Sequence, residues 1–425
     1  MKQTINNTVI CGISTLIFAS CSINQESHEI RTNTDSHSVP IENAISELNT
    51  TLRLLYSDTK TPTAKSTSNI SEIITVTYED LMGLKTKSDE NSDFENLLYV
   101  INFEDSNGTA VLGADNRLEP VIAIIDSGYL NLEDFTRLTF FENSLPLNQL
   151  YDAETDDIYL GADCPNGTHV AAILNYVITS IQVYEDPDFS TPDMWPGTGE
   201  SGYEMYDISP LLNTAWGQGT PYNAKLDNND AGCTTIAAAQ ILTCNKDIPL
   251  NTCFGVTRSN WKQLERKHFY ELPDNGNTQK DSIYIWTDDI ATVIKRIADG
   301  IGVTYNYLSS GGTFATPKKV ARYLKSIGYS SAKVHTQYIE SEIIMMLTHK
   351  KPVFIGALGS RVNTDEKKGS GHAWVIDGIK TKWDGSGRKH LLHCNWGWNG
   401  DCNGYYTTQS MVLWNTMKKT TALTA

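Results

Sequence analysis

The chain has 425 residues, a formal net charge of −16, 40% hydrophobic residues and 20% charged residues. That length allows two or three domains of roughly 100–200 residues each, and the composition is ordinary for a folded protein. The acidic balance argues against a general nucleic-acid binder, no apolar run reaches the roughly 18 residues that span a bilayer, and eight cysteines are too few for a disulfide scaffold.

Residues 1–20 are typical of an export signal rather than of a folded element. Lys2 is the only positive charge, a short apolar stretch comes next, and small residues precede Cys21. This pattern resembles a bacterial lipoprotein signal, which implies that Cys21 is acylated and becomes the new N-terminus. An ordinary cleaved signal, or no signal at all, stays open because Phe18 departs from the usual aliphatic residue. Export predicts either a cell-surface lipoprotein of the outer-membrane type or a secreted protein.

The next two segments differ in composition. Residues 21–70 are rich in Ser, Thr, Asn and Gln, so we expect a polar tether with one helix over 41–56 that docks on the neighbouring domain. Residues 71–185 predict a small α+β domain. Its β-rich runs indicate strands over 97–103, 109–114 and 120–126, with Asn107-Gly108 as a hairpin turn, and its periodicity indicates a helix over 168–184.

Residues 186–202 contain several prolines and glycines without periodicity, which is typical of an exposed linker that proteases can cut. Residues 203–425 predict a second, larger domain. We expect helices after Gly232 and over 288–299 and 317–327. Strands are expected over 352–357, 372–379, 390–396 and 404–408.

Cys233 is the candidate nucleophile. It follows Gly232 in AGCTTIAAAQIL, at the start of a predicted helix. The unpaired N–H groups of a helix N-terminus favour a thiolate and can donate to an oxyanion. A buried cysteine that acts as a small hydrophobic residue is the alternative interpretation.

His372 is the candidate base because it follows Gly369 and Gly371 in GSGHAWVIDG and opens a predicted strand, where a ring can be fixed yet stay open to a cleft. Its separation from Cys233 (372 − 233 = 139) lies within the roughly 130–150 residues typical of papain-type cysteine peptidases. Asn395, in HCNWGWNG on the next strand, is placed to accept a hydrogen bond from the ring, and Trp396 to cover that bond. Each residue alone is more often structural, but the ordered trio is not.

The segments GCTTIAAAQI, GHAWVIDG and NWGWNG together resemble the streptopain family of papain-like cysteine peptidases over about 210–410. The resemblance implies an α+β, papain-like fold with a helical part and an antiparallel β part. It implies that Cys233 is the nucleophile and His372 the general base. It further implies that Asn395 orients His372 and that Trp396 and Trp398 form active-site walls.

Gln218 lies in TAWGQGTPYN, ahead of Cys233. Because papain-like enzymes carry an oxyanion-hole glutamine upstream of the nucleophile, the resemblance implies that Gln218 is this donor, beside the Cys233 N–H. The glycine-rich and aromatic region 300–314 is a candidate lining for a substrate pocket, with a plain connection as the alternative.

The small domain also resembles the inhibitory propeptide of this family, through LLYVINF and GADNRLEPVIAIIDSG. This implies a zymogen with a signal at 1–20, a tether at 21–70, an inhibitory prodomain at 71–185, a maturation region at 186–202 and a protease domain at 203–425. The implied partners are protein or peptide substrates and the chain's own prodomain. Neither nucleic acid nor a transmembrane span is predicted, and a lipid anchor is possible.

No metal or cofactor is predicted. A zinc site built from His390, His393, Cys394 and Cys402 is unfavourable because His393 and Cys394 point to opposite faces of a strand. The calcium-loop resemblance at 227–232 fails at alanines that should be ligands. Cys394 and Cys402 either pair or stay free, and the pairing of Cys164, Cys244 and Cys253 is open.

The sequence thus predicts a cysteine endopeptidase made as an autoinhibited zymogen. A thiol acyltransferase or cell-wall peptide hydrolase with the same Cys–His pair is the alternative, because all three share an acyl-enzyme. A third interpretation is non-enzymatic, with the small domain as an inhibitor or adhesin module.

Overall fold

The structure is a computed structural model. It describes residues 37–56, 69–82, 96–136, 151–152, 157–158, 168–185, 206–244, 256–264, 280–308, 311–335, 338–358, 371–383, 388–408 and 421–424. The predictions for the export signal, Cys21, the 186–202 linker, Cys164 and Cys253 lie outside these residues. The N-terminal part denotes the described residues up to 185, and the C-terminal part denotes those from 206 onward.

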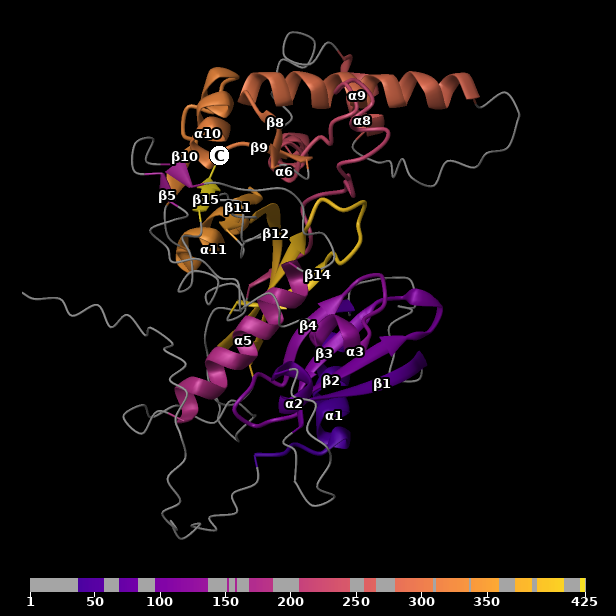
Figure 1. Cartoon of the computed structure of the whole chain (residues 1–425), viewed down its shortest axis with the longest axis vertical. Helices are drawn as coiled ribbons and strands as arrows, with labels where there is room; N and C mark the ends of the chain where they lie inside the picture. The colour runs from indigo at the N-terminus through magenta and orange to yellow at the C-terminus, as the bar shows by residue number, and fades with distance from the viewer. Residues whose placement is uncertain are drawn as a thin grey trace, which may run out of the picture. The chain divides into compact units, whose positions relative to one another are not determined.

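The largest sheet of the described residues is antiparallel and has eleven strands (Figure 1). Its path runs β1-β2-β3-β4-β14-β13-β12-β11-β15-β10, and β7 pairs with β12. In chain order the strands are β1 (Ile70–Thr77), β2 (Asn96–Phe103), β3 (Thr109–Gly113), β4 (Val121–Ile125), β7 (Asp207–Ile208), β10 (Lys333–His335), β11 (Val353–Leu358), β12 (Gly371–Trp383), β13 (Arg388–Asn395), β14 (Gly404–Thr407) and β15 (Thr421–Thr424).

The three strands predicted in the small domain are confirmed as β2, β3 and β4, and their continuous apolar runs are buried almost throughout. β2 and β3 form the predicted antiparallel hairpin, with a short 3₁₀ turn at Glu104–Ser106 before Asn107. Gly108 has φ +97°, and a Cβ there would lie 2.0 Å from the carbonyl oxygen of Ile125. The turn residue is therefore a glycine because neighbouring backbone occupies the space of a side chain.

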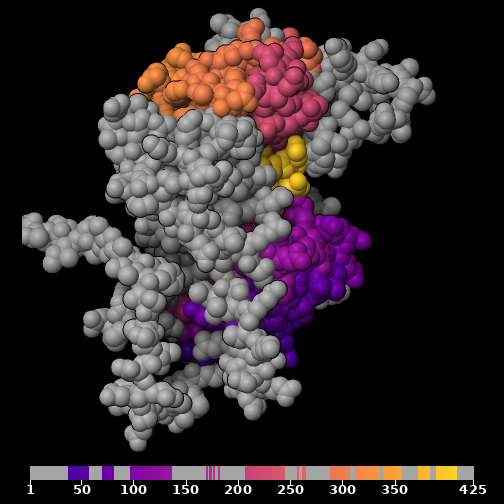
Figure 2. Space-filling model, in the orientation of Figure 1, coloured from indigo at the N-terminus to yellow at the C-terminus, as the bar shows by residue number. Residues whose placement is uncertain are grey.

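The sheet is continuous across the two parts of the chain, because β4 pairs antiparallel with β14. Residues 37–425 accordingly form one compact unit. In Figure 2 purple side chains of the N-terminal part adjoin yellow side chains of the C-terminal part. The exact domain boundaries stay a prediction, but the strands on either side of them share one hydrogen-bonded sheet.

Helices cover both faces of this sheet. The predicted helix at 41–56 is α1 (Ile41–Tyr56), which packs its apolar stripe on β3, β4 and β12. The other face carries α5 (Thr168–Glu185) and α11 (Glu340–Thr348). Shorter elements are α2 (Tyr78–Met82), α3 (Leu132–Thr136), β5 (Tyr151–Asp152) and β6 (Asp157–Ile158).

A helical layer with its own apolar core lies beside the C-terminal strands, so the predicted α+β class with a helical and an antiparallel part is confirmed. Its helices are α6 (Cys233–Thr243), α8 (Arg258–Leu264), α9 (Lys280–Ile301) and α10 (Pro317–Ser326), with the hairpin β8 (Thr304–Leu308) and β9 (Gly311–Phe314). α9 is longer than the predicted 288–299. α10 begins as predicted, since Thr316 caps it and Pro317 occupies its first turn.

Candidate active site

Cys233 is the first residue of α6, as predicted, and its side chain is buried. The preceding Gly232 has φ +80°, and a Cβ there would lie 2.7 Å from the Cβ of Thr313 on β9. Thr313 Oγ1 also donates to the carbonyl of Asp230 at 2.6 Å. The chain can therefore enter α6 only through a glycine, which fixes the position of the thiol at the helix N-terminus.

α6 is buried along its whole length, which explains the run of alanines after Cys233. The helix packs against β11, β12 and α9. Cys233 shares a core with Ala373 and Val375 of β12, the strand that carries His372. The two motifs, which lie far apart in the sequence, are thus brought onto adjacent elements.

His372 lies on β12 within a cage of indoles. Its ring centroid is 4.6 Å from that of Trp398, 6.1 Å from Trp396 and 6.2 Å from Trp374. His372 Nε2 donates to the carbonyl oxygen of Trp396 at 2.8 Å. Because a carbonyl can only accept, the neutral ring carries its proton on Nε2 and its lone pair on Nδ1. Nδ1 is therefore the nitrogen able to take a proton from a thiol.

Burial lowers the pKa of His372 to about 4, although the hydrogen bond to Trp396 raises it. A second histidine sits at the same cage. His169, near the start of α5, has its ring centroid 6.0 Å from Trp398 and 6.4 Å from Trp396. Burial, and then the nearby His372 ring, lower the pKa of His169 to about 4. Both imidazoles are thus neutral at physiological pH in the full-length chain.

Sequence reasoning did not give His169 a role. Its only local signal is a histidine at the start of an apolar helix, which by itself indicates nothing about the tryptophans some 230 residues away. No described residue hydrogen-bonds either ring nitrogen of His169.

Asn395 ends β13 and holds the turn beside His372. Its Nδ2 donates to the carbonyl of Thr214 at 2.8 Å, and its Oδ1 accepts from Gln240 Nε2 at 3.0 Å and from the Gly397 N–H at 3.2 Å. The ring hydrogen bond of His372 is accepted one residue further on, by the Trp396 carbonyl. The orienting bond between Asn395 and His372 is not among these contacts and stays a prediction.

Gln218 lies in a buried segment tied to the nucleophile. Its carbonyl accepts from the N–H of Ala231, two residues before Cys233, at 3.0 Å. Asn399 donates its N–H to the carbonyl of Trp216 at 3.1 Å, and a Cβ on Gly217 would lie 2.3 Å from Asn399 Oδ1. Gln218, the predicted oxyanion donor, therefore lies in a segment that contacts both the residues before α6 and the turn 396–399.

The remaining cysteines of the described residues are not bonded to one another. Cys244, Cys394 and Cys402 are thiols, so the disulfide considered for Cys394 and Cys402 is absent. Burial raises the pKa of both the Cys394 and the Cys402 thiol, that of Cys402 to about 12. Their protonated state opposes a nucleophilic role for either. Among the described residues, no helix is both long and apolar enough to cross a membrane.

The sequence of the C-terminal part matches the model of a known family. Residues 216–406 match the model of the Peptidase C10 family. The matched region contains all three motifs that carry the resemblance. The resemblance to streptopains predicted from the three motifs is thereby confirmed.

Individual streptopains agree with the family model. The chain is 33% identical over 121 residues to streptopain of Streptococcus pyogenes serotype M28 (strain MGAS6180) and 32% identical to that of serotype M1. Each alignment covers 26% of this chain, which spans about a quarter of the length of these curated relatives. Among solved structures, a fragment of prointerpain A of Prevotella intermedia matches with 19% identity and a TM-score of 0.47, over 83% of this chain and 98% of that one.

Proposed function

We propose that the chain is a cysteine endopeptidase made as an autoinhibited zymogen. The observation that supports the proposal is that the Peptidase C10 region holds both a thiol at a helix N-terminus and, on a strand that packs against this helix, an imidazole whose Nε2–H is already engaged. Such a ring presents only Nδ1 as a base. His372 therefore takes the proton of Cys233 through Nδ1 and stabilises the thiolate.

The reaction then proceeds through the residues in place. The Cys233 thiolate attacks the carbonyl carbon of a peptide, and the oxyanion forms at the Cys233 N–H and the Gln218 side chain. The imidazolium of His372 gives its proton to the leaving amine. Water, deprotonated by the neutral ring, then hydrolyses the thioester and releases the acid product.

Contacts between the two parts of the chain support autoinhibition. Acidic side chains of the N-terminal part pair with basic side chains of the C-terminal part: Glu119 with Lys389 at 2.8 Å, Asp126 with His393 at 3.4 Å, and Glu47 with Lys382. Burial would lower the pKa of His393, but Asp377 and Asp126 raise it to about 10, so this ring is cationic. His169 adds a contact at the indole cage that holds His372.

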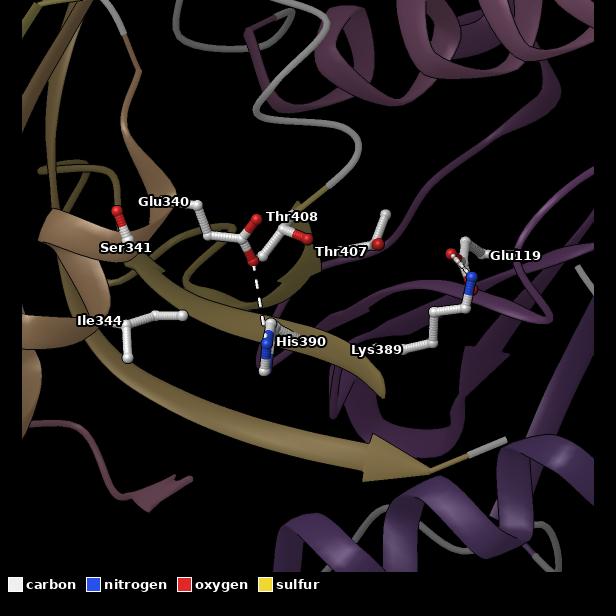
Figure 3. A pocket seen from close by; sticks show the side chains of 8 residues that line it. All are labelled: Glu119, Glu340, Ser341, Ile344, Lys389, His390, Thr407 and Thr408. Atoms are coloured by element: carbon white, nitrogen blue, oxygen red, sulfur yellow. Dashed lines mark ion pairs between the residues drawn. The ribbon is translucent and has the colours of Figure 1, made fainter. Parts of the chain in front are cut away.

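A pocket of about 480 Å³ marks the same junction (Figure 3). Glu119 of the N-terminal part forms one wall, and α11, β13 and β14 form the rest. Neither Cys233 nor His372 lines it. Release of the N-terminal part would remove a wall of this pocket and break the Glu119–Lys389 ion pair.

Autoprocessing of the full-length chain tests the proposal. Wild type should cleave itself within residues 185–205 and then hydrolyse casein, whereas Cys233→Ala should stay full length. Cys244→Ala is the matched control, because it removes another thiol of the same domain and should process normally. Equal processing of Cys233→Ala and wild type, or no labelling of Cys233 by a thiol-directed epoxide, would contradict the proposal. Amine transfer without hydrolysis would instead indicate an acyltransferase.

We also propose that the chain is exported through residues 1–20 and anchored by lipid at Cys21. The support is the short apolar stretch followed by small residues and a cysteine. Mass spectrometry of the N-terminal peptide from cell envelopes should show a diacylglyceryl group on Cys21, and Cys21→Ser should release the protein from the envelope. An unmodified N-terminus at another position would indicate simple cleavage.

A further inference from the structure

Gln240 is a buried polar residue in an otherwise apolar helix. It lies on α6, two turns beyond Cys233, and its side chain is fully excluded from solvent. A buried amide is costly unless its donors and acceptors are satisfied. The contacts that satisfy Gln240 all lead to segments of the candidate active site.

The first contact reaches the turn that holds His372. Gln240 Nε2 donates to Asn395 Oδ1 at 3.0 Å, and the same oxygen accepts the N–H of Gly397. Asn395 and Gly397 flank Trp396, whose carbonyl accepts the hydrogen bond from His372 Nε2. The position of that carbonyl is thus set by a bond that begins on the nucleophile's own helix.

The second contact reaches the segment that carries Gln218. Gln240 Oε1 accepts the N–H of Trp216 at 3.2 Å, two residues before Gln218. Asn395 closes the arrangement, because its Nδ2 donates to the carbonyl of Thr214 in the same segment. One amide therefore ties α6, the segment 214–218 and the turn 395–397 to one another.

From this geometry we infer that Gln240 is a positioning residue for the proposed peptidase reaction. It does not touch the reacting atoms. It holds the Trp396 carbonyl so that His372 keeps its proton on Nε2 and its lone pair on Nδ1. It also keeps the Gln218 side chain in position to donate to the oxyanion. The inference rests on the proposed function and gives a role to a residue of the GCTTIAAAQI segment to which the sequence alone assigned none.

The proposed role of Gln240 requires both the donor and the acceptor of its amide. It can therefore be tested by a substitution that keeps the size of the side chain and removes only the donor. Gln240→Glu keeps the shape and the acceptor for Trp216, but an ionised carboxylate cannot donate to Asn395 Oδ1 and repels it. A protonated carboxyl restores the donor. Because burial raises the pKa of a carboxyl, the protonated form should be populated in mildly acidic solution.

The measurement is the ratio of kcat for Gln240→Glu to kcat for wild type, taken on the self-processed enzymes from pH 5 to 8. We expect a 10- to 100-fold loss at pH 8 with an unchanged KM, and recovery to within about 3-fold at pH 5. Thr235→Val, a buried isosteric change on the same helix, should match wild type at every pH. A pH-independent ratio for Gln240→Glu, or no loss at all, would overturn the inference.

A second pair of variants decides the matter if Gln240→Glu does not fold. Gln240→Met is a neutral isostere, and its loss of kcat should be less than additive with that of Asn395→Ala, because both variants remove the Gln240–Asn395 bond. Additive losses would overturn the inference. If wild type hydrolyses no peptide, the proposed function fails, and the alkylation rate of Cys233 by iodoacetamide in the same variants still tests Gln240.

Discussion

The imidazoles of His169 and His372 are buried against the same two indoles, and the pKa of each lies near 4. A histidine whose pKa is lowered in the docked state stabilises that state only while it is neutral. The contribution is complete above the ordinary pKa of about 6.5 and is lost as the pH falls toward 4. Acid should therefore loosen the N-terminal part from the cage.

We expect the tryptophan fluorescence of full-length Cys233→Ala to change between pH 6.5 and 4 as the cage opens. His169→Phe should move this transition to lower pH, because it removes one of the two groups that must charge. His349→Phe, at an exposed position after α11, is the control and should leave the transition in place. Coincident curves for His169→Phe and wild type would show that His169 does not couple to docking.

The entry to α6 gives a second prediction. Gly232→Ala must place a Cβ at φ +80° and 2.7 Å from Thr313, so the helix start and Cys233 must shift. We expect at least a 10-fold loss of kcat/KM after activation. Gly302→Ala is the control, because Gly302 has φ +71° with nothing within 4 Å of an added Cβ. It carries the backbone strain of about 1 kcal/mol without the clash. Equal activities for the two variants would contradict this account.

Single residues differ in how far the sequence could predict them. Cys233 and His372 lie in local motifs, where glycines and the start of a helix or strand indicate a fixed side chain. Gln240 shares the GCTTIAAAQI segment with Cys233, but that segment does not show which residues it contacts, and His169 has no local motif. The bond from Gln240 reaches Asn395 across 155 residues, and His169 meets its tryptophans through tertiary packing alone. Their roles depend on contacts that periodicity cannot encode.

Elements were predictable where one pattern dominates. The helices α1, α5 and α10 have clear apolar stripes or caps, and the strands β2, β3 and β4 are bounded by turn residues. The pairing of β4 with β14 was not predictable, because strand partners depend on backbone hydrogen bonds between distant segments. That pairing is what makes the N-terminal part continuous with the candidate protease.

Gly404 tests the β4–β14 pairing. A Cβ there would lie 2.2 Å from the carbonyl oxygen of Ile124 and 2.8 Å from the Cα of Ile125, both in β4. We expect Gly404→Ala to push β4 away and to shorten the lag before autoprocessing, as measured by electrophoresis. If activation removes the N-terminal part, as proposed, the active enzyme lacks β4 and should keep its kcat/KM.

Gly128→Ala is the control for this element, because Gly128 also has a positive φ but nothing lies within 4 Å of an added Cβ. Its lag should equal that of wild type. A Gly404→Ala variant that processes at the wild-type rate, or whose activated form is equally impaired, would show that the pairing does not restrain activation.

At the scale of the whole molecule, the net charge of −16 does not show how acidic and basic partners are divided between the two parts. In the three ion pairs seen between described residues of the two parts, every acid lies in the N-terminal part and every base in the C-terminal part. Such pairs fix register and orientation as well as adding stability. The side chain of Glu119 is only 4% exposed, so this carboxylate depends on Lys389 for compensation.

Lys389→Glu should therefore leave two facing carboxylates at the junction shown in Figure 3 and shorten the lag before autoprocessing at least 10-fold. Loss of one partner of a buried pair costs about 3–5 kcal/mol, whereas an exposed pair contributes less than about 1 kcal/mol. Lys295→Glu, which breaks the exposed pair with Asp299 on α9, should accordingly leave the lag unchanged. The swapped double variant Glu119→Lys/Lys389→Glu restores opposite charges and should recover much of the wild-type lag. If the double variant processes as fast as Lys389→Glu alone, the pair does not hold the two parts together, and the restraint on activation lies in the β4–β14 strand pair and the indole cage.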